Sequence, residues 1–168
     1  MDQELSLESD NFRKLMSRFA TGVTVVAIRQ PDDSVVAMTA NAISSVSLEP
    51  ILLLICVEKV ANMAQVLVAA DEFSICILPE DRDDLSDYFA GRALEKQPAF
   101  AFVGWEAGPL LEGALAAVGC RRYAVEDGGD HWIVLGEVVA IHQPQLPPQP
   151  LIFYNRRYRR LIPLENHS

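Results

Sequence analysis

The stretch that decides the fold is Leu115–Ile141, LAAVGCRRYAVEDGGDHWIVLGEVVAI. Two long runs rich in apolar residues, Leu115–Val125 and Trp132–Ile141, flank the short segment Asp127-Gly128-Gly129-Asp130. Asp-Gly and Gly-Gly pairs between such runs indicate a β-hairpin, because glycine readily adopts the positive φ angles of a tight turn. The stretch therefore predicts two long antiparallel strands.

Outward from this hairpin, the chain adds more strands, and most of them are joined as hairpins. Val23–Ile28 and Val35–Thr39 flank the turn-rich segment Gln30–Ser34, which predicts a second hairpin. Ile51–Val57 is a continuous apolar run of strand length, typical of a buried strand. Gln143–Pro150 holds four prolines and is expected to be an extended connection. Further strands are predicted at Phe73–Leu78, Leu151–Tyr154 and Tyr158–Ile162.

Three short helices are predicted between the strands. Apolar residues recur at helical spacing over Phe12–Phe19, with Asp10 as the capping residue. Val60–Ala70 is amphipathic, and Pro79–Phe89 begins with proline and acidic residues and ends before Gly91. Because the helices fall between strands without regular βαβ alternation, the chain is expected to be mainly β with peripheral helices. We expect one domain, residues 1–168, folded as a closed or partly closed antiparallel barrel.

The composition limits the partners of this chain. It has 168 residues, which fits one domain, and its 23 acidic and 14 basic residues give a formal net charge of −9. This balance argues against nucleic acid and against an anionic membrane surface, because both require a basic face. No apolar run approaches the roughly 20 residues of a membrane span. Met1–Asp10 has no secretory signal pattern, so the cytoplasm is the expected location.

The sequence gives no support for a metal site, a dinucleotide-binding Rossmann domain, a P-loop or a nucleophilic triad. The three cysteines, Cys56, Cys76 and Cys120, form no CxxC motif and have no histidine at metal-ligand spacing. Each lies in or beside an apolar stretch and is expected to be a buried free thiol. No metal is therefore expected, and nothing favours a hydrolase.

The most unusual segment is Met38–Pro50, MTANAISSVSLEP, which lies between two predicted strands. Hydroxyl groups and small side chains crowd here, so backbone N–H groups and hydroxyls can come close to a flat or phosphorylated ligand. The alternative is a polar connecting loop whose hydroxyls bond its own backbone. The residues alone leave both interpretations open.

A second candidate is Gly129-Asp130-His131, at the turn into a strand. A histidine beside a tight turn can donate hydrogen bonds or carry protons near neutral pH. The alternative is an ordinary hairpin turn with His131 as a surface residue.

A third candidate is Tyr154–Arg160, which carries four of the 14 basic residues. Arginine matches the geometry of phosphate, and tyrosine offers a face for stacking. A solvated hairpin tip or a subunit interface is the equally open alternative.

Together these segments resemble the short-chain flavin reductase family, whose members are FMN-binding antiparallel split β-barrels. The family contains the reductase components of two-component flavin-dependent monooxygenases. The resemblance covers nearly the whole chain. The matching stretches are, in order, Phe12–Val26, Met38–Pro50, Phe73–Leu78 with Tyr88–Gly91, Gly129–Val138, and Pro150–Tyr158.

The resemblance implies two kinds of site residue. His131 would lie where the nicotinamide stacks on the flavin and Asp130 would orient it, so these two are the expected catalytic residues. Thr39–Ala42 would meet the isoalloxazine, Val46–Ser47 the ribityl chain and phosphate, and Cys56–Glu58 the other side of the ring. The full set of expected flavin-binding residues is Thr39, Ala40, Asn41, Ala42, Val46, Ser47, Cys56, Val57, Glu58, Asn62 and Tyr158.

The implied activity is that of an NAD(P)H:flavin oxidoreductase, which transfers a hydride from NAD(P)H to FMN, with FAD and riboflavin as the alternative flavins. The implied partners are a second copy of the chain in a homodimer and a monooxygenase that receives reduced flavin. Two alternatives stay open: a non-catalytic flavin-binding split barrel, and an FMN-dependent oxidoreductase that acts on another substrate.

Two positions depart from the family's pattern. Ala61 lies in the segment where the family often has hydroxyls, which leaves Lys59 and Asn62 as the polar candidates. Ala99 stands where a basic residue is frequent. Both departures fall on the expected phosphate contacts, so weaker flavin retention, another preferred flavin and a changed function are alternatives. The expected basic contribution is the Arg156–Arg160 cluster.

Overall fold

The computed structural model describes residues 6–145 and 149–162, and their largest unit is one seven-stranded antiparallel sheet. The predicted mainly β architecture with peripheral helices is confirmed. Two small sheets, β7-β8 and β1-β11-β12, accompany the large one. The elements are α1 Ser9–Met16, β1 Thr21–Gly22, β2 Thr24–Arg29, β3 Val35–Ala40, β4 Ile43–Leu48, β5 Ile51–Glu58, α2 Asn62–Ala69, β6 Glu72–Ile77, α3 Asp83–Phe89, β7 Phe102–Trp105, β8 Gly108–Leu111, β9 Ala116–Gly128, β10 His131–His142, β11 Ile152–Tyr154 and β12 Arg157–Arg159.

The long hairpin predicted from Leu115–Ile141 is formed by β9 and β10. Their pairing starts with His131 opposite Gly128 and contains two irregularities, which bend and twist the pair. Gly129 closes the turn with a φ of 81°, a conformation that costs glycine little. β10 pairs with β5 on its other side and β9 with β6, so the hairpin lies in the middle of the sheet.

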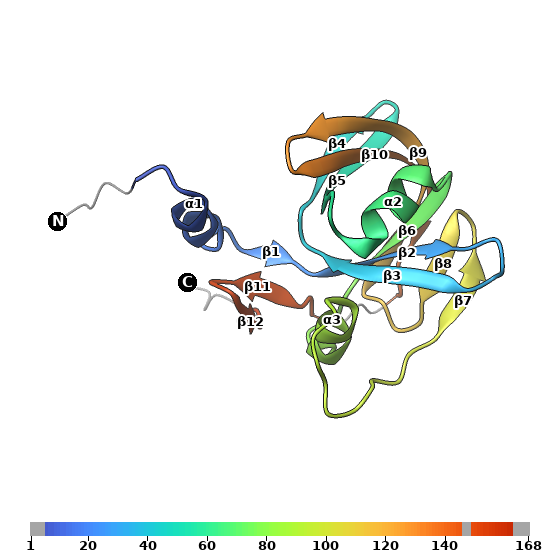
Figure 1. Ribbon diagram of the computed structural model, residues 1–168. Helices are drawn as coiled ribbons and strands as arrows, with labels where there is room; N and C mark the ends of the chain where they lie inside the picture. The colour runs from blue at the N-terminus through green and yellow to red at the C-terminus, as the bar shows by residue number, and fades with distance from the viewer. Residues whose placement is uncertain (1–5, 146–148, 163–168) are drawn as a thin grey trace, which may run out of the picture.

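The sheet runs in the order β3-β2-β6-β9-β10-β5-β4, which makes β3 and β4 its two edges. It curves around α2, which contacts β3 on one side and β10 on the other (Figure 1). Among the described strands, no ladder joins β3 to β4, so the barrel is split rather than closed. This is the predicted antiparallel split barrel.

Two apolar clusters hold the sheet and the helices together. In the first, Met63 and Leu67 of α2 pack with Ile55 and Phe73 of the sheet. Gly136 gives the Phe73 ring its space, because a Cβ at that position would lie 2.6 Å from the ring. The second cluster lies on the other side, where Leu85 of α3 is buried with residues of β2, β6 and β8.

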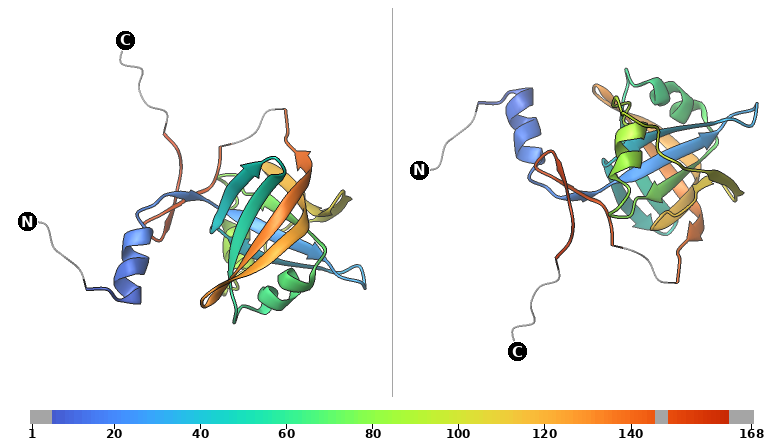
Figure 2. Two further views of the ribbon diagram at one scale, coloured as in Figure 1. Left: turned by 90° about the horizontal axis from the view of Figure 1, so that it is seen from above. Right: turned by 90° about the horizontal axis from the view of Figure 1, so that it is seen from below.

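The two ends of the chain form a separate arm. β1 pairs with β11, and the backbone N–H of Asn155 donates a hydrogen bond of 2.7 Å to the carbonyl of Ser17 at the end of α1. Figure 2 shows α1 and the β11–β12 hairpin standing beside the barrel. The described residues of α1 include no buried side chain, although Phe12, Leu15 and Met16 form an apolar face.

The structure corrects the sequence prediction in the Met38–Pro50 segment. Its polar part, Asn41–Ser47, is mostly the edge strand β4 rather than a loop. Ser44 and Ser45 are exposed, because β4 has a sheet neighbour on only one side and faces solvent. Hydroxyl content therefore misled the interpretation of this segment.

Other boundaries were also wrong. α1 starts at Ser9, with Asp10 in its first turn rather than at its cap, and α3 starts at Asp83. Pro79, expected to open α3, instead forms an isolated bridge with Pro150. The β1 strand and the β7–β8 hairpin were not predicted, and Ile162 lies beyond β12.

Part of the Gln143–Pro150 connection, residues 146–148, lies outside the described residues. In the part of the chain that the structure describes, no helix combines the length and the apolar character needed to cross a bilayer.

Candidate functional site

The expected catalytic pair lies where β10 begins beside the end of β5. His131 is opposite Glu58 in the ladder, and the next position along β5, Val57, is opposite Trp132. Asp130 Oδ1 lies 2.7 Å from His131 Nδ1. This hydrogen bond, followed by the charge of the ring, lowers the pKa of the Asp130 carboxyl below its ordinary value. An ionised Asp130 accepts the Nδ1 proton, which leaves Nε2 of His131 as the ring atom available to a ligand.

Lys59 fixes the turn that carries this pair. Its backbone N–H donates to the carbonyl of Asp130 at 2.9 Å, and its Nζ donates to Asp127 Oδ2 at 2.6 Å. The ammonium also lies 4.4 Å from the centroid of the Trp132 ring. The bond from Lys59 lowers the pKa of the Asp127 carboxyl. The connection between β5 and α2 is thus joined to the tip of the β9–β10 hairpin.

The link between β3 and β4 lies against the same strand, β5. The backbone N–H of Cys56 donates to the carbonyl of Ala42 at 2.9 Å. Asn41 Nδ2 donates to Thr21 Oγ1 at 3.2 Å, and Thr24 Oγ1 donates to the carbonyl of Ala40 at 2.7 Å. These bonds fix the path of the chain from β3 into β4. The structure therefore brings Ala42 beside Cys56 on the strand whose end pairs with His131.

A cavity of about 980 Å³ lies between β3, α2 and the segment around the end of α3. Thr39 and Asn62 line it, and so does Ala61, one of the two departures from the family pattern. Thr39 Oγ1 donates to the carbonyl of Ser86 in α3 at 2.6 Å, which ties β3 to α3 across the cavity wall. The other lining residues are Val35, Val36, Ala37, Met38, Met63, Val66, Tyr88, Phe89, Ala90, Gly91, Arg92, Phe100 and Phe102.

The chemistry of this lining fits a large flat ligand. Tyr88, Phe89 and Phe100 form a cluster with ring centroids 5.0 to 5.3 Å apart. A cavity of this size with aromatic walls and a few polar groups is typical of cofactor sites. Its walls therefore suit an aromatic ring system with a polar or anionic tail, as a flavin nucleotide has.

Tyr158 is not among the residues that line the cavity, and its expected flavin contact stays a prediction. Its hydroxyl donates to Asp87 Oδ1 and contacts Ser86 Oγ at 2.9 Å. Burial, followed by the hydrogen bond to Asp87, raises the pKa of Tyr158, so the phenol stays a donor. Asp87 in turn holds Arg92 through an ion pair of 2.7 Å.

Val46 and Ser47 do not line this cavity. Val46 is 47% exposed on the edge strand β4, and Ser47 is paired with Leu52 near the far end of that strand. Ser47 Oγ accepts a hydrogen bond from the backbone N–H of Glu49 at 3.2 Å. The expected contacts of these two residues with the ribityl chain and phosphate stay a prediction.

Sequence reasoning missed the contribution of the segment that ends α3. The sequence assigns no site role to Tyr88–Gly91 or to Arg92, yet all five residues line the cavity. The sequence signal for this segment was the basic residue Arg92, which follows the aromatic pair Tyr88-Phe89 and Gly91. The Arg156–Arg160 cluster, expected to supply positive charge, does not line the cavity.

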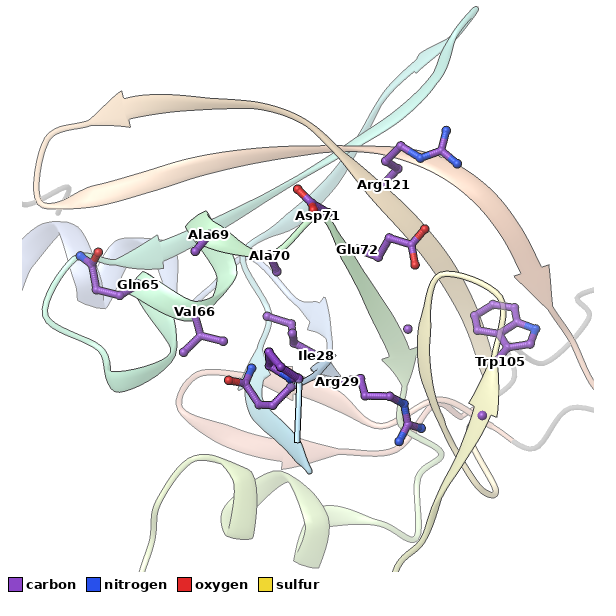
Figure 3. A pocket seen from close by; sticks show the side chains of 14 residues that line it. Ile28, Arg29, Gln65, Val66, Ala69, Ala70, Asp71, Glu72, Trp105 and Arg121 are labelled. Atoms are coloured by element: carbon purple, nitrogen blue, oxygen red, sulfur yellow. The ribbon is translucent and has the colours of Figure 1, made fainter. Parts of the chain in front are cut away.

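A second cavity, of about 1050 Å³, lies near the other end of α2. Figure 3 shows Arg29, Glu72, Trp105 and Arg121 around it. None of the expected site residues lines this cavity, so the smaller one is the better candidate although it is not the largest. Within residues 6–145 and 149–162, no cluster of three or more potential metal ligands is found.

The three thiols give a test of the position of Cys56. Burial raises the pKa of Cys120 to about 12 and raises that of Cys76, whereas Cys56 is only half-buried. Because the thiolate is the reactive form, a thiol reagent near neutral pH should modify one cysteine in the folded protein and all three after unfolding. We expect added FMN to slow the modification of Cys56. Equal rates for Cys56 and Cys120 would contradict this assignment, as peptide mapping can show.

Comparisons with known proteins identify the family of this chain. Residues 16–161 match the model of the flavin reductase like domain family. The reductase component of 4-hydroxyphenylacetate 3-monooxygenase from Thermus thermophilus is 40% identical over 151 residues, which cover 90% of this chain and 95% of the relative. The reductase subunit HsaB of a flavin-dependent monooxygenase from Mycobacterium tuberculosis is 33% identical, covering 94% of this chain and 84% of the relative.

Among solved structures, the NADH:FAD oxidoreductase SgcE6 of Streptomyces globisporus C-1027, in complex with NAD and FAD fragments, superposes with a TM-score of 0.88. It is 33% identical, and the match covers 98% of this chain and all of that one. The predicted family is therefore confirmed, because the match extends over nearly the whole chain. This chain belongs to the flavin reductase like domain family.

Proposed function

We propose that this chain is the reductase component of a two-component system and supplies reduced flavin to a separate monooxygenase. As a member of its family, it is an NAD(P)H-dependent flavin oxidoreductase. The observation that carries the proposal is the aromatic-walled cavity of about 980 Å³ that Thr39 and Asn62 line. The names of the relatives, which are reductase components and subunits of monooxygenases, support the delivery of reduced flavin.

In this proposal the flavin ring extends from the cavity at Thr39 along the end of β3 and the start of β4, beyond the residues that line the cavity. Ala40, Asn41 and Ala42 offer backbone groups to it, and Cys56, Val57 and Glu58 close its other side. Backbone contacts suit this role, because small side chains let a flat ring approach the main chain. A flavin held by these residues would supply the hydride-accepting chemistry of its ring system.

His131 is proposed to orient the nicotinamide. Asp130 holds Nδ1, so Nε2 is free to bond the carboxamide of the nicotinamide. Lys59 keeps the turn in place through its bonds to Asp127 and Asp130. This chain then contributes binding and orientation, which can account for a large share of the rate of a hydride transfer.

We also propose a homodimer whose interface includes α1. An isolated helix of eight residues is unstable in water, yet α1 stands beside the barrel with Phe12 59% exposed, and Phe19, shortly after the helix, is 70% exposed. Leu48, at the end of the edge strand β4, is also exposed. We propose that a second copy of the chain covers the exposed apolar side chains of α1, since two-fold homodimers are the commonest assemblies.

The cytoplasmic location expected from the sequence remains part of the proposal, because the reaction consumes NAD(P)H.

The activity is tested by following NADH and NADPH oxidation with FMN, FAD or riboflavin in turn. We expect oxidation to depend on added flavin and to be near background without it. The Arg121→Gln variant, whose exposed side chain lines only the other cavity, serves as a control and should keep the rate. A folded protein that oxidises neither nucleotide with any of the three flavins would contradict the proposed function.

A further inference from the structure

The arm formed by the two ends of the chain carries a large share of the positive charge. Residues 9–22 and 152–160 hold seven of the 14 basic residues and one of the 23 acidic residues. The seven are Arg13, Lys14, Arg18, Arg156, Arg157, Arg159 and Arg160. Because the formal net charge is −9, the rest of the chain is strongly acidic. An anion that approaches this protein is therefore attracted by the arm and repelled elsewhere.

The β11–β12 hairpin of this arm places two arginines and a tyrosine on one face. Tyr154 is opposite Arg157 in the ladder, and Arg159 is two positions further along β12. These three side chains share a face, because side chains alternate along a strand and cross-strand partners lie on the same side. The other face holds Phe153 and Tyr158, whose ring centroids are 5.6 Å apart. Since the Tyr158 hydroxyl contacts α3, the arginine face is turned away from α3.

The side chains of the arginine face are available to a ligand. Tyr154, Arg157 and Arg159 are all exposed. Within residues 6–145 and 149–162, neither arginine forms an ion pair or a side-chain hydrogen bond. By contrast, four arginines outside the arm each bond a carboxylate, namely Arg29, Arg82, Arg92 and Arg122. A guanidinium without an internal partner keeps all five N–H donors for an anion.

The backbone holds this face in one arrangement. The two residues of the hairpin turn, Asn155 and Arg156, both have positive φ angles, 49° and 60°. A two-residue turn of this kind matches the twist of the strands and fixes their register, which keeps Tyr154 opposite Arg157. The backbone N–H of Asn155 also donates to the carbonyl of Ser17 at 2.7 Å. The hairpin is therefore tied to the end of α1.

The helix α1 connects this hairpin to the turn that carries His131. In Figures 1 and 2 the tip of the β9–β10 hairpin lies on the side of the barrel that faces α1. The pKa of the Asp130 carboxyl, lowered mainly by His131, is lowered further by the charge of Arg13 in α1. Arg13 and Ser17 are one helical turn apart, which is about 6 Å along the axis. The arginine face and His131 are thus the two ends of one continuous surface.

The two ends of this surface match the two halves of a nicotinamide dinucleotide. One half is the nicotinamide, which His131 is proposed to orient. The other half is an adenosine with two or three phosphate groups. A tyrosine ring beside two arginines suits that half, because the adenine can stack on the ring and the phosphates can accept from the guanidinium forks.

We infer that Tyr154, Arg157 and Arg159 bind the adenosine phosphate half of NAD(P)H. The inference rests on the proposed function, since it starts from a nicotinamide held at His131. It explains how a strongly acidic chain attracts a polyanionic substrate: the arm concentrates the nucleotide beside the site. It also implies that NADPH gains more from the arm than NADH does, because its 2′-phosphate adds charge.

The first test is equilibrium binding of two nucleotide fragments that lack nicotinamide, ADP-ribose and its 2′-phosphate. The variant is the double change Arg157→Gln and Arg159→Gln. We expect it to bind the 2′-phosphorylated fragment about 10-fold more weakly at low ionic strength, and ADP-ribose with a smaller loss. High salt should reduce the difference between variant and wild type, because it screens exposed charges. Calorimetry measures these affinities without any turnover.

The second test is steady-state oxidation of each nucleotide with FMN. In the double variant the KM for NADPH should rise about 10-fold and that for NADH less, with kcat within about twofold of the wild type. FMN affinity should not change. Arg121→Gln is the control for the single Arg157→Gln change, because it removes the same charge from an exposed position outside the arm. This control should keep the wild-type KM for both nucleotides.

Four results would overturn the inference. They are no binding of either fragment to the wild type, an unchanged KM for both nucleotides in the double variant, an equal rise in KM in Arg121→Gln, and a fall in kcat without a change in KM. The last result would assign the arm a structural role. The fate of the proposed function is read separately. A double variant that reaches the wild-type kcat leaves the reductase activity intact, and a wild type that binds ADP-ribose but oxidises neither nucleotide counts against the activity alone.

Discussion

Replacing His131 with alanine is expected to slow the reduction of bound flavin by NAD(P)H about 10- to 100-fold, with a much smaller change in flavin affinity. The physical reason is the arrangement at the start of β10. Asp130 holds Nδ1 at 2.7 Å, which fixes the ring and directs Nε2 to a ligand. In the proposed arrangement, removing the imidazole takes away the group that orients the nicotinamide and leaves the proposed flavin contacts on β3 and β5 unchanged.

The measurement is single-turnover flavin reduction by rapid mixing without oxygen, with FMN affinity measured separately. His142→Ala is the matched control, because His142 lies at the other end of β10 beside Trp105. We expect this control to reduce flavin at the wild-type rate. Asp130→Asn should give a smaller loss than His131→Ala, since it weakens the orientation of a ring that is still present.

An unchanged single-turnover rate in His131→Ala would refute the role of this histidine. A parallel loss of flavin affinity and reduction would instead place His131 among the flavin-binding groups. Either result would leave the family and the fold unaffected, because neither depends on His131.

The second large effect is expected from α1. Changing both Phe12 and Leu15 to glutamate should convert the proposed dimer to a monomer. These side chains are 59% and 58% exposed in the single chain, and burying each on dimerisation is worth about 1.5–3 kcal/mol per subunit at most. Losing that burial and adding charge to the interface should weaken association by at least about 100-fold.

Sedimentation or light scattering at matched protein concentrations measures this change. Lys14→Glu is the control, because it alters the net charge by the same amount on the opposite face of α1. We expect this control to remain a dimer. A monomeric wild type, or a double variant that stays dimeric, would exclude α1 from a dimer interface.

Local turn chemistry explains why the hairpins could be predicted. In β9–β10 the glycines at the turn and the apolar runs agree, so the hairpin follows from the sequence. In β7–β8 the strands are four residues each, and the turn places the non-glycine Ala107 at a φ of 55°. Nothing in that turn's composition signals a hairpin, and it was missed.

The candidate site was less predictable, because its members come from distant parts of the chain. Thr39 meets α3 through Ser86, 47 positions away, and Asn62 faces the same cavity from α2. Arg92 gains significance only when Asp87 and Tyr158 fix it beside that cavity. The expected ring contacts come from the family resemblance and stay a prediction, whereas the position of Arg92 beside the cavity became visible only in the folded chain.

The most direct test of the central claim is anaerobic mixing of the FMN-equilibrated protein with NADH or NADPH while the flavin absorbance is recorded. The account predicts that the yellow flavin absorbance is lost in one turnover, much faster than in FMN and nucleotide mixed without protein. Bound FMN that keeps its absorbance with both nucleotides would contradict the assignment of this chain as a flavin reductase.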